Sequence, residues 1–308
     1  NPWLAEQEDQ ARLDLAQLVA EGDRLAFSTD SYVIDPLFFP GGNIGKLAIC
    51  GTANDVAVSG AIPRYLSCGF ILEEGLPMET LKAVVTSMAE TARAAGIAIV
   101  TGDTKVVQRG AADKLFINTA GMGAIPANIH WGAQTLTAGD VLLVSGTLGD
   151  HGATILNLRE QLGLDGELVS DCAVLTPLIQ TLRDIPGVKA LRDATRGGVN
   201  AVVHEFAAAC GCGIEISEAA LPVKPAVRGV CELLGLDALN FANEGKLVIA
   251  VERNAAEQVL AALHSHPLGK DAALIGEVVE RKGVRLAGLY GVKRTLDLPH
   301  AEPLPRIC

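Results

Sequence analysis

The chain has 308 residues, with 25 Lys and Arg against 36 Asp and Glu, so its formal net charge is −11. This length favours two domains. An acidic chain with no basic run is a poor candidate for binding nucleic acid or an anionic membrane surface. The apolar runs are short and broken by glycine, so we expect no transmembrane helix, and we expect no signal peptide. Seven cysteines without a secretion signal favour a reduced, cytoplasmic protein over a disulfide scaffold.

Apolar periodicity predicts alternating strands and helices along most of the chain. In the first part, strands are expected at 24–35, 64–73, 97–107 and 115–125, and helices at 10–20, 41–63 and 78–96. The pattern restarts after a boundary-like segment at 130–140. Strands are then expected at 141–146, 188–198, 213–217, 246–252 and 271–280, and helices from about 152 and at 171–183, 199–211, 224–235 and 254–266. This order predicts an α/β chain whose sheets are covered by helices.

Four aspartates stand out as candidate metal ligands. Asp30, Asp103 and Asp193 each come at the end of an apolar strand segment, where ligands gather in such folds. Asp55 lies inside an apolar helix, with small residues four positions before and after it on the same face. Any one of them could be a cap or a turn former. Together, the four carboxylates favour Mg²⁺, which bridges a few carboxylates to substrate phosphates.

A second candidate is the stretch "DATRGGV" (193–199), which places Thr195, Gly197 and Gly198 where a helix begins. Free amides at a helix N-terminus bind phosphate, and Arg196 can add a charged fork. An ordinary strand-to-helix turn is the alternative. The stretch "GGNIGK" (41–46) lacks the spacing of a nucleotide P-loop.

Three further residues have both a chemical and a structural interpretation. Lys105, two residues after Asp103, suits either phosphate neutralisation or a solvated strand end. Glu244 lies in a tight turn before an apolar strand, where it could have a chemical role or be a turn former. His151 lies in a glycine-rich turn, and for it we favour a structural or capping role.

The C-terminus, "LDLPHAEPLPRIC", carries three prolines and ends on Cys308. Proline keeps a chain extended. About twenty residues at ~3.3 Å each could reach roughly 65 Å. We therefore expect a flexible tail from residue 288 that presents an exposed thiol, whose selectivity comes from access rather than acidity.

Three segments resemble the signatures of the aminoimidazole-ribonucleotide synthetase (PurM-like) superfamily: "GKLAICGTANDVAVSGAIPRYLSCGFILEEGLP", "GIAIVTGDTKV" and "LRDATRGG". The tail, "YGVKRTLDLP…EPLPRIC", narrows the resemblance to the carbamoyl dehydratase family of hydrogenase maturation. The resemblance implies an α/β (α+β), PurM-like fold of two domains. Residues 1–128 would bind ATP and form half of an intersubunit β-barrel, residues 129–287 a layered sheet-and-helix domain, and residues 288–308 the tail.

The resemblance also implies a reaction. A carbamoyl group received from the carbamoyltransferase HypF would be loaded on Cys308, dehydrated with ATP and Mg²⁺ to a thiocyanate, and passed as cyanide to the HypC–HypD iron-carrier complex for the [NiFe] site. The implied catalytic residues are Cys308, Glu244 as the base and Lys105. The implied metal ligands are Asp30, Asp55, Asp103 and Asp193, and the implied nucleotide-binding residues are Lys46, Asn54, Thr104, Thr195, Arg196, Gly197 and Gly198.

The family carries a glycine-rich segment that folds over the nucleotide, and this chain begins after it, so we expect an incomplete ATP clamp. Two rival hypotheses remain. A sister ATP-dependent enzyme of selenophosphate, thiamine-phosphate or purine synthesis would not need the terminal cysteine. A non-catalytic carrier or scaffold would use Cys308 for metal binding or thiol exchange and would not hydrolyse ATP.

Overall fold

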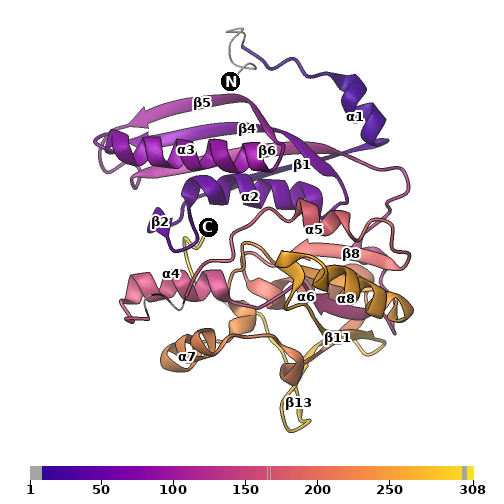
Figure 1. The fold of residues 1–308 in the computed structure, drawn as a ribbon. Coiled ribbons are helices and arrows are strands. Elements are labelled where there is room, and N and C mark those ends of the chain that lie inside the picture. The colour runs from indigo at the N-terminus through magenta and orange to yellow at the C-terminus, as the bar shows by residue number, and fades with distance from the viewer. Residues whose placement is uncertain (1–8, 165, 167, 300–303) are drawn as a thin grey trace.

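The computed structural model describes residues 9–164, 166, 168–299 and 304–308. Its first part is a four-stranded sheet in the order β1-β6-β4-β5, in which only β4 and β5 are parallel. Helices α2 and α3 pack against each other and the sheet, and α2 connects this layer with the rest of the molecule (Figure 1). The elements are α1 (Leu15–Glu21), β1 (Arg24–Tyr32), β2 (Phe38–Phe39), β3 (Gly42–Asn43), α2 (Ile44–Ala57), β4 (Ile62–Glu73), α3 (Met78–Ala94), β5 (Ala98–Val107) and β6 (Leu115–Ile125).

Helix α2 is buried on nearly all sides, which explains its uninterrupted small and apolar composition. It begins where the side chain of Asn43 accepts hydrogen bonds from the amides of Gly45 and Lys46. Gly45 is required at the crossing with α3, because a Cβ there would lie 2.5 Å from the carbonyl oxygen of Val84.

The second part is a seven-stranded sheet in the order β13-β12-β9-β11-β7-β10-β8. Alternate residues of β7 and β10 point to opposite faces, one packed on α6 and the other on α5 and α8. The elements are β7 (Val141–Val144), α4 (Asp150–Glu160), α5 (Thr176–Gln180), β8 (Val188–Asp193), α6 (Gly198–Cys210), β9 (Gly213–Ser217), α7 (Pro225–Leu234), β10 (Leu247–Val251), α8 (Ala256–His264), β11 (Ala273–Val279), β12 (Gly283–Ala287) and β13 (Lys293–Thr295). Within the described ranges, no helix has both the length and the apolarity needed to cross a membrane.

The prediction of a helix over 171–183 was wrong for its first half, since α5 covers only Thr176–Gln180. Residues 171–175 run without helix or strand because α2 binds their backbone. The side-chain amide of Asn54 donates to the carbonyl of Ala173 at 3.0 Å and accepts from the amide of Leu175 at 2.8 Å. Tertiary partners therefore outweigh helix propensity in this segment.

The prediction of an exposed terminal thiol was also wrong. Cys308 is 7% exposed, and together with Leu304 and Ile307 it joins the apolar core formed by α2, α4 and α7. Figure 1 shows the C-terminus between α2 and α4, where the two parts of the molecule meet. The second sheet also continues past residue 288, where the tail was expected to begin. Strand β12 ends at Ala287, and β13 adds a further strand after it.

Candidate active site

Three of the four predicted aspartates converge from different elements. On β1, the hydroxyl of Ser28 donates to the carboxylate of Asp55 on α2 at 2.7 Å, and Asp30 lies two residues further on the same face of the strand. Burial raises the pKa of Asp55, and the charge of Asp30 adds to the increase. At the end of β8, burial raises the pKa of Asp193 to about 7, with the charge of Asp55 as the next cause. These carboxylates therefore share one site and repel one another.

One oxygen of this cluster, Oδ2 of Asp193, is buried without a hydrogen-bond partner in the described part of the chain. Within the described residues, no group of three or more His, Cys, Asp or Glu side chains is arranged to hold a metal ion by itself. Mg²⁺ bound with a nucleotide commonly takes one or two carboxylates and completes its coordination with phosphate oxygens and water. Carboxylates that repel one another, one of them with an unsatisfied oxygen, are therefore suited to bind a metal ion together with phosphate oxygens.

Asp103 does not join this cluster within one chain. It pairs in register with Gly69, which pairs with Asn118, which pairs with Ser31, so its side chain shares the face of Ser31 and not that of Asp30. It also lies three strands from β1, or about 14 Å at the usual strand spacing. On that open face, Asp103 forms a salt bridge of 2.9 Å with Lys105, and both side chains are mostly exposed.

The turn from β8 into α6 has the geometry that the sequence predicted. Gly197 and Gly198 have φ of 75° and 60°. A Cβ on Gly198 would lie 2.4 Å from the carbonyl oxygen of Leu239, so only glycine fits. The turn brings the guanidinium of Arg196 to 4.0 Å from the sulfur of Cys308. The segment thus combines a helix N-terminus, a cation and the terminal thiol.

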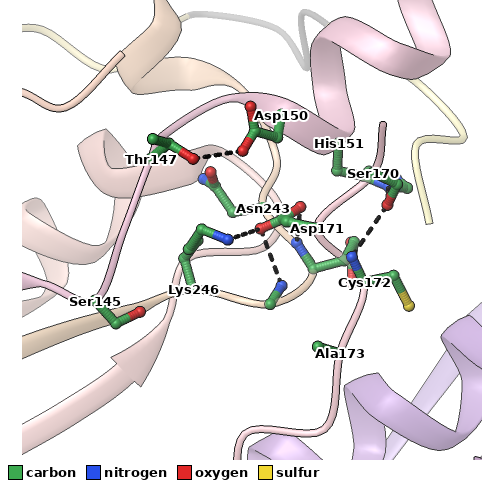
Figure 2. A network of polar contacts seen from close by, with 12 residues as sticks. Ser145, Thr147, Asp150, His151, Ser170, Asp171, Cys172, Ala173, Asn243 and Lys246 are labelled. Atoms are coloured by element: carbon green, nitrogen blue, oxygen red, sulfur yellow. Dashed lines mark hydrogen bonds and ion pairs between the residues drawn. The ribbon is translucent and has the colours of Figure 1, made fainter. Parts of the chain in front are cut away.

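Glu244 is buried in the turn before β10, and its Oε1 has no hydrogen-bond partner among the residues that the structure describes. Burial raises its pKa well above the ordinary value, and the charges of Asp171, Asp193 and Asp30 raise it further. The turn itself is held by the carboxylate of Asp171, which accepts from the amides of Glu244 and Gly245 at 3.1 and 3.2 Å (Figure 2). A carboxyl group in this state is poised to exchange a proton with a nearby ligand.

The thiol of Cys308 lies within electrostatic range of this carboxyl group. Burial raises the pKa of the Cys308 thiol to about 12, and the next cause is the charge of Glu244, while the hydrogen bond from Arg196 lowers it. The thiol in this position is therefore protonated and shielded from solvent.

The chain end is held mainly through its backbone. The amide of Val33 donates to the main-chain oxygen of Cys308 at 2.9 Å. The guanidinium of Arg159 donates to the carbonyls of Pro305, at 2.7 Å, and of Arg306. Arg306 in turn donates to the carbonyl of Val33 at 2.9 Å and to Asp113 at 2.6 Å. Arg159 could not be recognised from the sequence, because an arginine on a helix is ordinarily a surface residue.

The remaining predicted nucleotide-binding residues lie apart from one another. The ammonium of Lys46 donates to the carbonyl of Gly41 at 2.8 Å, and Thr104 is exposed on β5. Asn54 is 1% exposed, and its amide group is occupied by the 173–175 backbone.

The comparisons with known proteins agree with this architecture. Residues 7–125 match the family described as AIR synthase related protein, N-terminal domain, and residues 137–288 match AIR synthase related protein, C-terminal domain. The two matches and the fold define the chain as a member of the AIR synthase related proteins, which confirms the predicted α/β, PurM-like fold.

Individual similar proteins identify the family within the AIR synthase related proteins. The chain is 99% identical over its whole length to carbamoyl dehydratase HypE of Escherichia coli (strain K12), of which it covers 92%. A solved structure of HypE in complex with ATP is 46% identical, with a TM-score of 0.94, and the alignment covers 100% of this chain and 92% of that chain. A chain of a HypE–HypF complex is 46% identical, with a TM-score of 0.87, over 97% of this chain and 96% of that chain. The chain belongs to the carbamoyl dehydratase HypE family of hydrogenase maturation enzymes.

Proposed function

We propose that the chain dehydrates a carbamoyl group carried on its own Cys308 to a thiocyanate, with ATP as the second substrate. The observation that carries this proposal is the burial of the terminal thiol within electrostatic range of Glu244, whose Oε1 has no hydrogen-bond partner among the described residues. A chain end threaded into a site with unsatisfied carboxyl groups is the arrangement expected of a tethered substrate, because tethering makes the reaction intramolecular.

Removal of oxygen from the carbamoyl group requires a leaving group. The carbamoyl oxygen attacks the γ-phosphorus of ATP, the bond to the β-phosphate oxygen breaks, and ADP leaves. The nitrogen then loses its protons, the carbon–oxygen bond breaks with departure of inorganic phosphate, and Cys308–S–C≡N remains. Glu244 is the proposed proton acceptor, because its raised pKa makes its carboxylate a stronger base than a solvated one.

The remaining side chains have electrostatic roles. Mg²⁺, when bound with the nucleotide, would neutralise phosphate charge between Asp30, Asp55 and Asp193. The amides of Thr195, Arg196 and Gly197 and the guanidinium of Arg196 would hold phosphate oxygens at the start of α6, in a turn closed by the Gly198 amide, which donates to the carbonyl of Thr195 at 2.9 Å. Arg196 lies close enough to Cys308 to act on the group attached to its sulfur.

Asp103 and Lys105 fit this scheme only through a second copy. They lie on the open face of the first sheet, where Leu25, Phe27 and Ile71 are 57%, 67% and 44% exposed. An apolar sheet face of this kind favours pairing with another sheet. We therefore propose a homodimer in which a β-barrel closes over this face and Asp103 and Lys105 serve the site of the partner copy.

The proposed partners follow from the reaction. HypF supplies the carbamoyl group, consistent with the 46% identical chain solved in a HypE–HypF complex. ATP is supported in the same way by the 46% identical HypE solved with ATP. The cyanide acceptor is proposed to be the HypC–HypD iron-carrier complex, and the compartment the cytoplasm.

The decisive measurement is intact-protein mass spectrometry after incubation with HypF, carbamoyl phosphate and Mg²⁺–ATP. We expect the mass of one carbamoyl group to be gained and one water then to be lost, with both changes on the peptide 303–308. Cys308→Ser should bind Mg²⁺–ATP normally and take up neither group. Modification of Cys50, Cys68 or another internal cysteine, with peptide 303–308 unchanged, would overturn the proposal. ATP-dependent activity in Cys308→Ser would favour a sister enzyme.

A further inference from the structure

His151 holds the chain end one residue before the thiol. The side chain is fully buried at the start of α4, and its Nε2 lies 2.8 Å from the carbonyl oxygen of Ile307. The ring of Phe39 packs edge-on against the imidazole with 5.3 Å between ring centroids, which limits its rotation. Because Ile307 directly precedes Cys308, this hydrogen bond fixes the backbone from which the thiol projects.

The hydrogen bond to Ile307 requires one particular tautomer. A carbonyl oxygen only accepts, so Nε2 must carry the proton. Burial lowers the pKa of His151, which favours the neutral ring with a single N–H. The Nδ1 atom must then be an acceptor, and the environment of Nδ1 decides whether the chain end is held.

Ser170 supplies that environment. Its hydroxyl oxygen lies 2.7 Å from Nδ1 of His151 and accepts the backbone amide of Cys172 at 3.2 Å. A hydroxyl has one proton, and with the amide of Cys172 donating to its oxygen, that proton is directed to Nδ1. A chain of hydrogen bonds therefore leads from the amide of Cys172 through Ser170 and His151 to the carbonyl of Ile307.

The same short segment also fixes the base. Asp171, the next residue, holds the backbone amides of Glu244 and Gly245 (Figure 2). The backbone amide of Ala173 donates to the carbonyl of Glu244 at 3.3 Å. Residues 170–173 thus hold both the tail, through His151, and Glu244, so this one segment fixes the position of the two reacting groups relative to each other.

We propose that Ser170 is a positioning residue of the reaction, which fixes the Nε2–H tautomer of His151 so that His151 docks the chain end and holds Cys308 against Glu244. The docking part stands on the hydrogen-bond geometry alone, and its consequence for dehydration rests on the proposed function.

Docking is measured without ATP, from the rate at which iodoacetamide alkylates Cys308, followed on the peptide 294–308 released by a lysine-specific protease. In Ser170→Ala, we expect alkylation about tenfold faster than in the wild type, as for the loss of one buried hydrogen-bond partner. Ser170→Thr keeps the hydroxyl and should stay within about twofold of the wild type. Ser145→Ala is the matched control, because Ser145 is also buried and also accepts a backbone amide, from Leu247 at 2.9 Å, but does not contact the tail.

The His151→Gln background separates the tautomer from packing. A glutamine amide donates from a position close to Nε2 and needs no partner to fix a tautomer, so Ser170→Ala should change alkylation by less than about twofold in this background. An equal acceleration in both backgrounds would show that Ser170 only supports the loop and would overturn the proposal, as would no acceleration at all.

Should His151→Gln fail to fold, ¹⁵N-histidine NMR of the wild type and Ser170→Ala decides. An Nε2–H tautomer lost in Ser170→Ala supports the proposal, and an Nδ1–H tautomer in the wild type overturns it. None of these measurements requires a carbamoyl group. A failed docking prediction is therefore distinguishable from a failure of the carbamoyl chemistry, which the intact-mass experiment reports.

Discussion

The carboxylates of Asp193 and Asp103 both end an apolar strand segment, yet their surroundings are opposite. Asp193 is 9% exposed, and among the described residues its Oδ2 has no hydrogen-bond partner. Burial and the charge of Asp55 raise its pKa, and the charge of Arg192 offsets this only in part. The side chain of Asp103 is 66% exposed and forms a salt bridge with Lys105. In the proposed homodimer, these two carboxyl groups would belong to one electrostatic site, which a metal–phosphate ligand would complete.

The largest effect should come from the buried part. Glu244→Gln keeps the size of the side chain but removes the proton acceptor, so dehydration should fall by roughly a hundredfold to ten-thousandfold. The carbamoylated form should accumulate, as seen by intact-protein mass spectrometry. Glu257→Gln, on the exposed surface of α8, is the control and should behave like the wild type. Normal formation of the thiocyanate in Glu244→Gln would place the base elsewhere.

The elements that depend on local pattern could be predicted from the sequence. The helix at 78–96 and the strands at 64–73 and 97–107 recur as α3, β4 and β5 with small changes of boundary. Apolar periodicity and the turn at 193–199, with its two glycines, are short-range signals, so they can be recognised without knowledge of the fold.

The structural features that were predicted wrongly depend on contacts between residues that are far apart in the sequence. Residues 171–175 have a helical sequence, but Asn54, more than a hundred positions earlier, binds their backbone. The last residues have the sequence of a solvated tail, but apolar packing and hydrogen bonds with Arg159, His151 and Val33, all distant in the sequence, bury residues 304, 307 and 308. Likewise, the separation of Asp103 from Asp30 follows from strand order and register, which no local motif encodes.

Lys105, an exposed residue of the proposed site, should respond to mutation differently from the buried Glu244. Lys105→Ala should lower dehydration by roughly a hundredfold, the usual cost of removing one transition-state charge partner. Its melting temperature should stay unchanged, because the side chain is 71% exposed. If Lys105 acts in the partner's site, then mixing Lys105→Ala with Glu244→Gln chains should restore about a quarter of wild-type activity, since half of randomly formed dimers hold one intact site. Two mutants that stay inactive when mixed, with exchange of chains verified by mass, would mean that Lys105 and Glu244 serve the same chain.

The smallest expected effect, and the one that compares the two aspartates directly, is on stability against pH in the absence of nucleotide. The folded-state pKa of Asp193 is about 7, above the ordinary 3.8. The folded protein therefore keeps this proton over a range in which the unfolded chain has lost it, so stability should fall as the pH rises from about 4 to about 7. The full difference corresponds to about 4 kcal/mol, and coupling to Asp55 makes roughly 2 to 4 kcal/mol the expected range.

Asp193→Asn should remove this slope and leave the variant several degrees more stable than the wild type near pH 7, as measured by thermal melts across that range. The contribution of Asp103 to the pH dependence of stability has the opposite sign. The hydrogen bond from Lys105 lowers the pKa of Asp103, so its small contribution is present above the ordinary pKa and is lost as the pH falls below it. Asp103→Asn should therefore leave the slope between pH 4 and 7 as it is in the wild type. If Asp193→Asn also kept the wild-type slope, the buried carboxyl would not be the strained group, and the contrast between the two aspartates would fail.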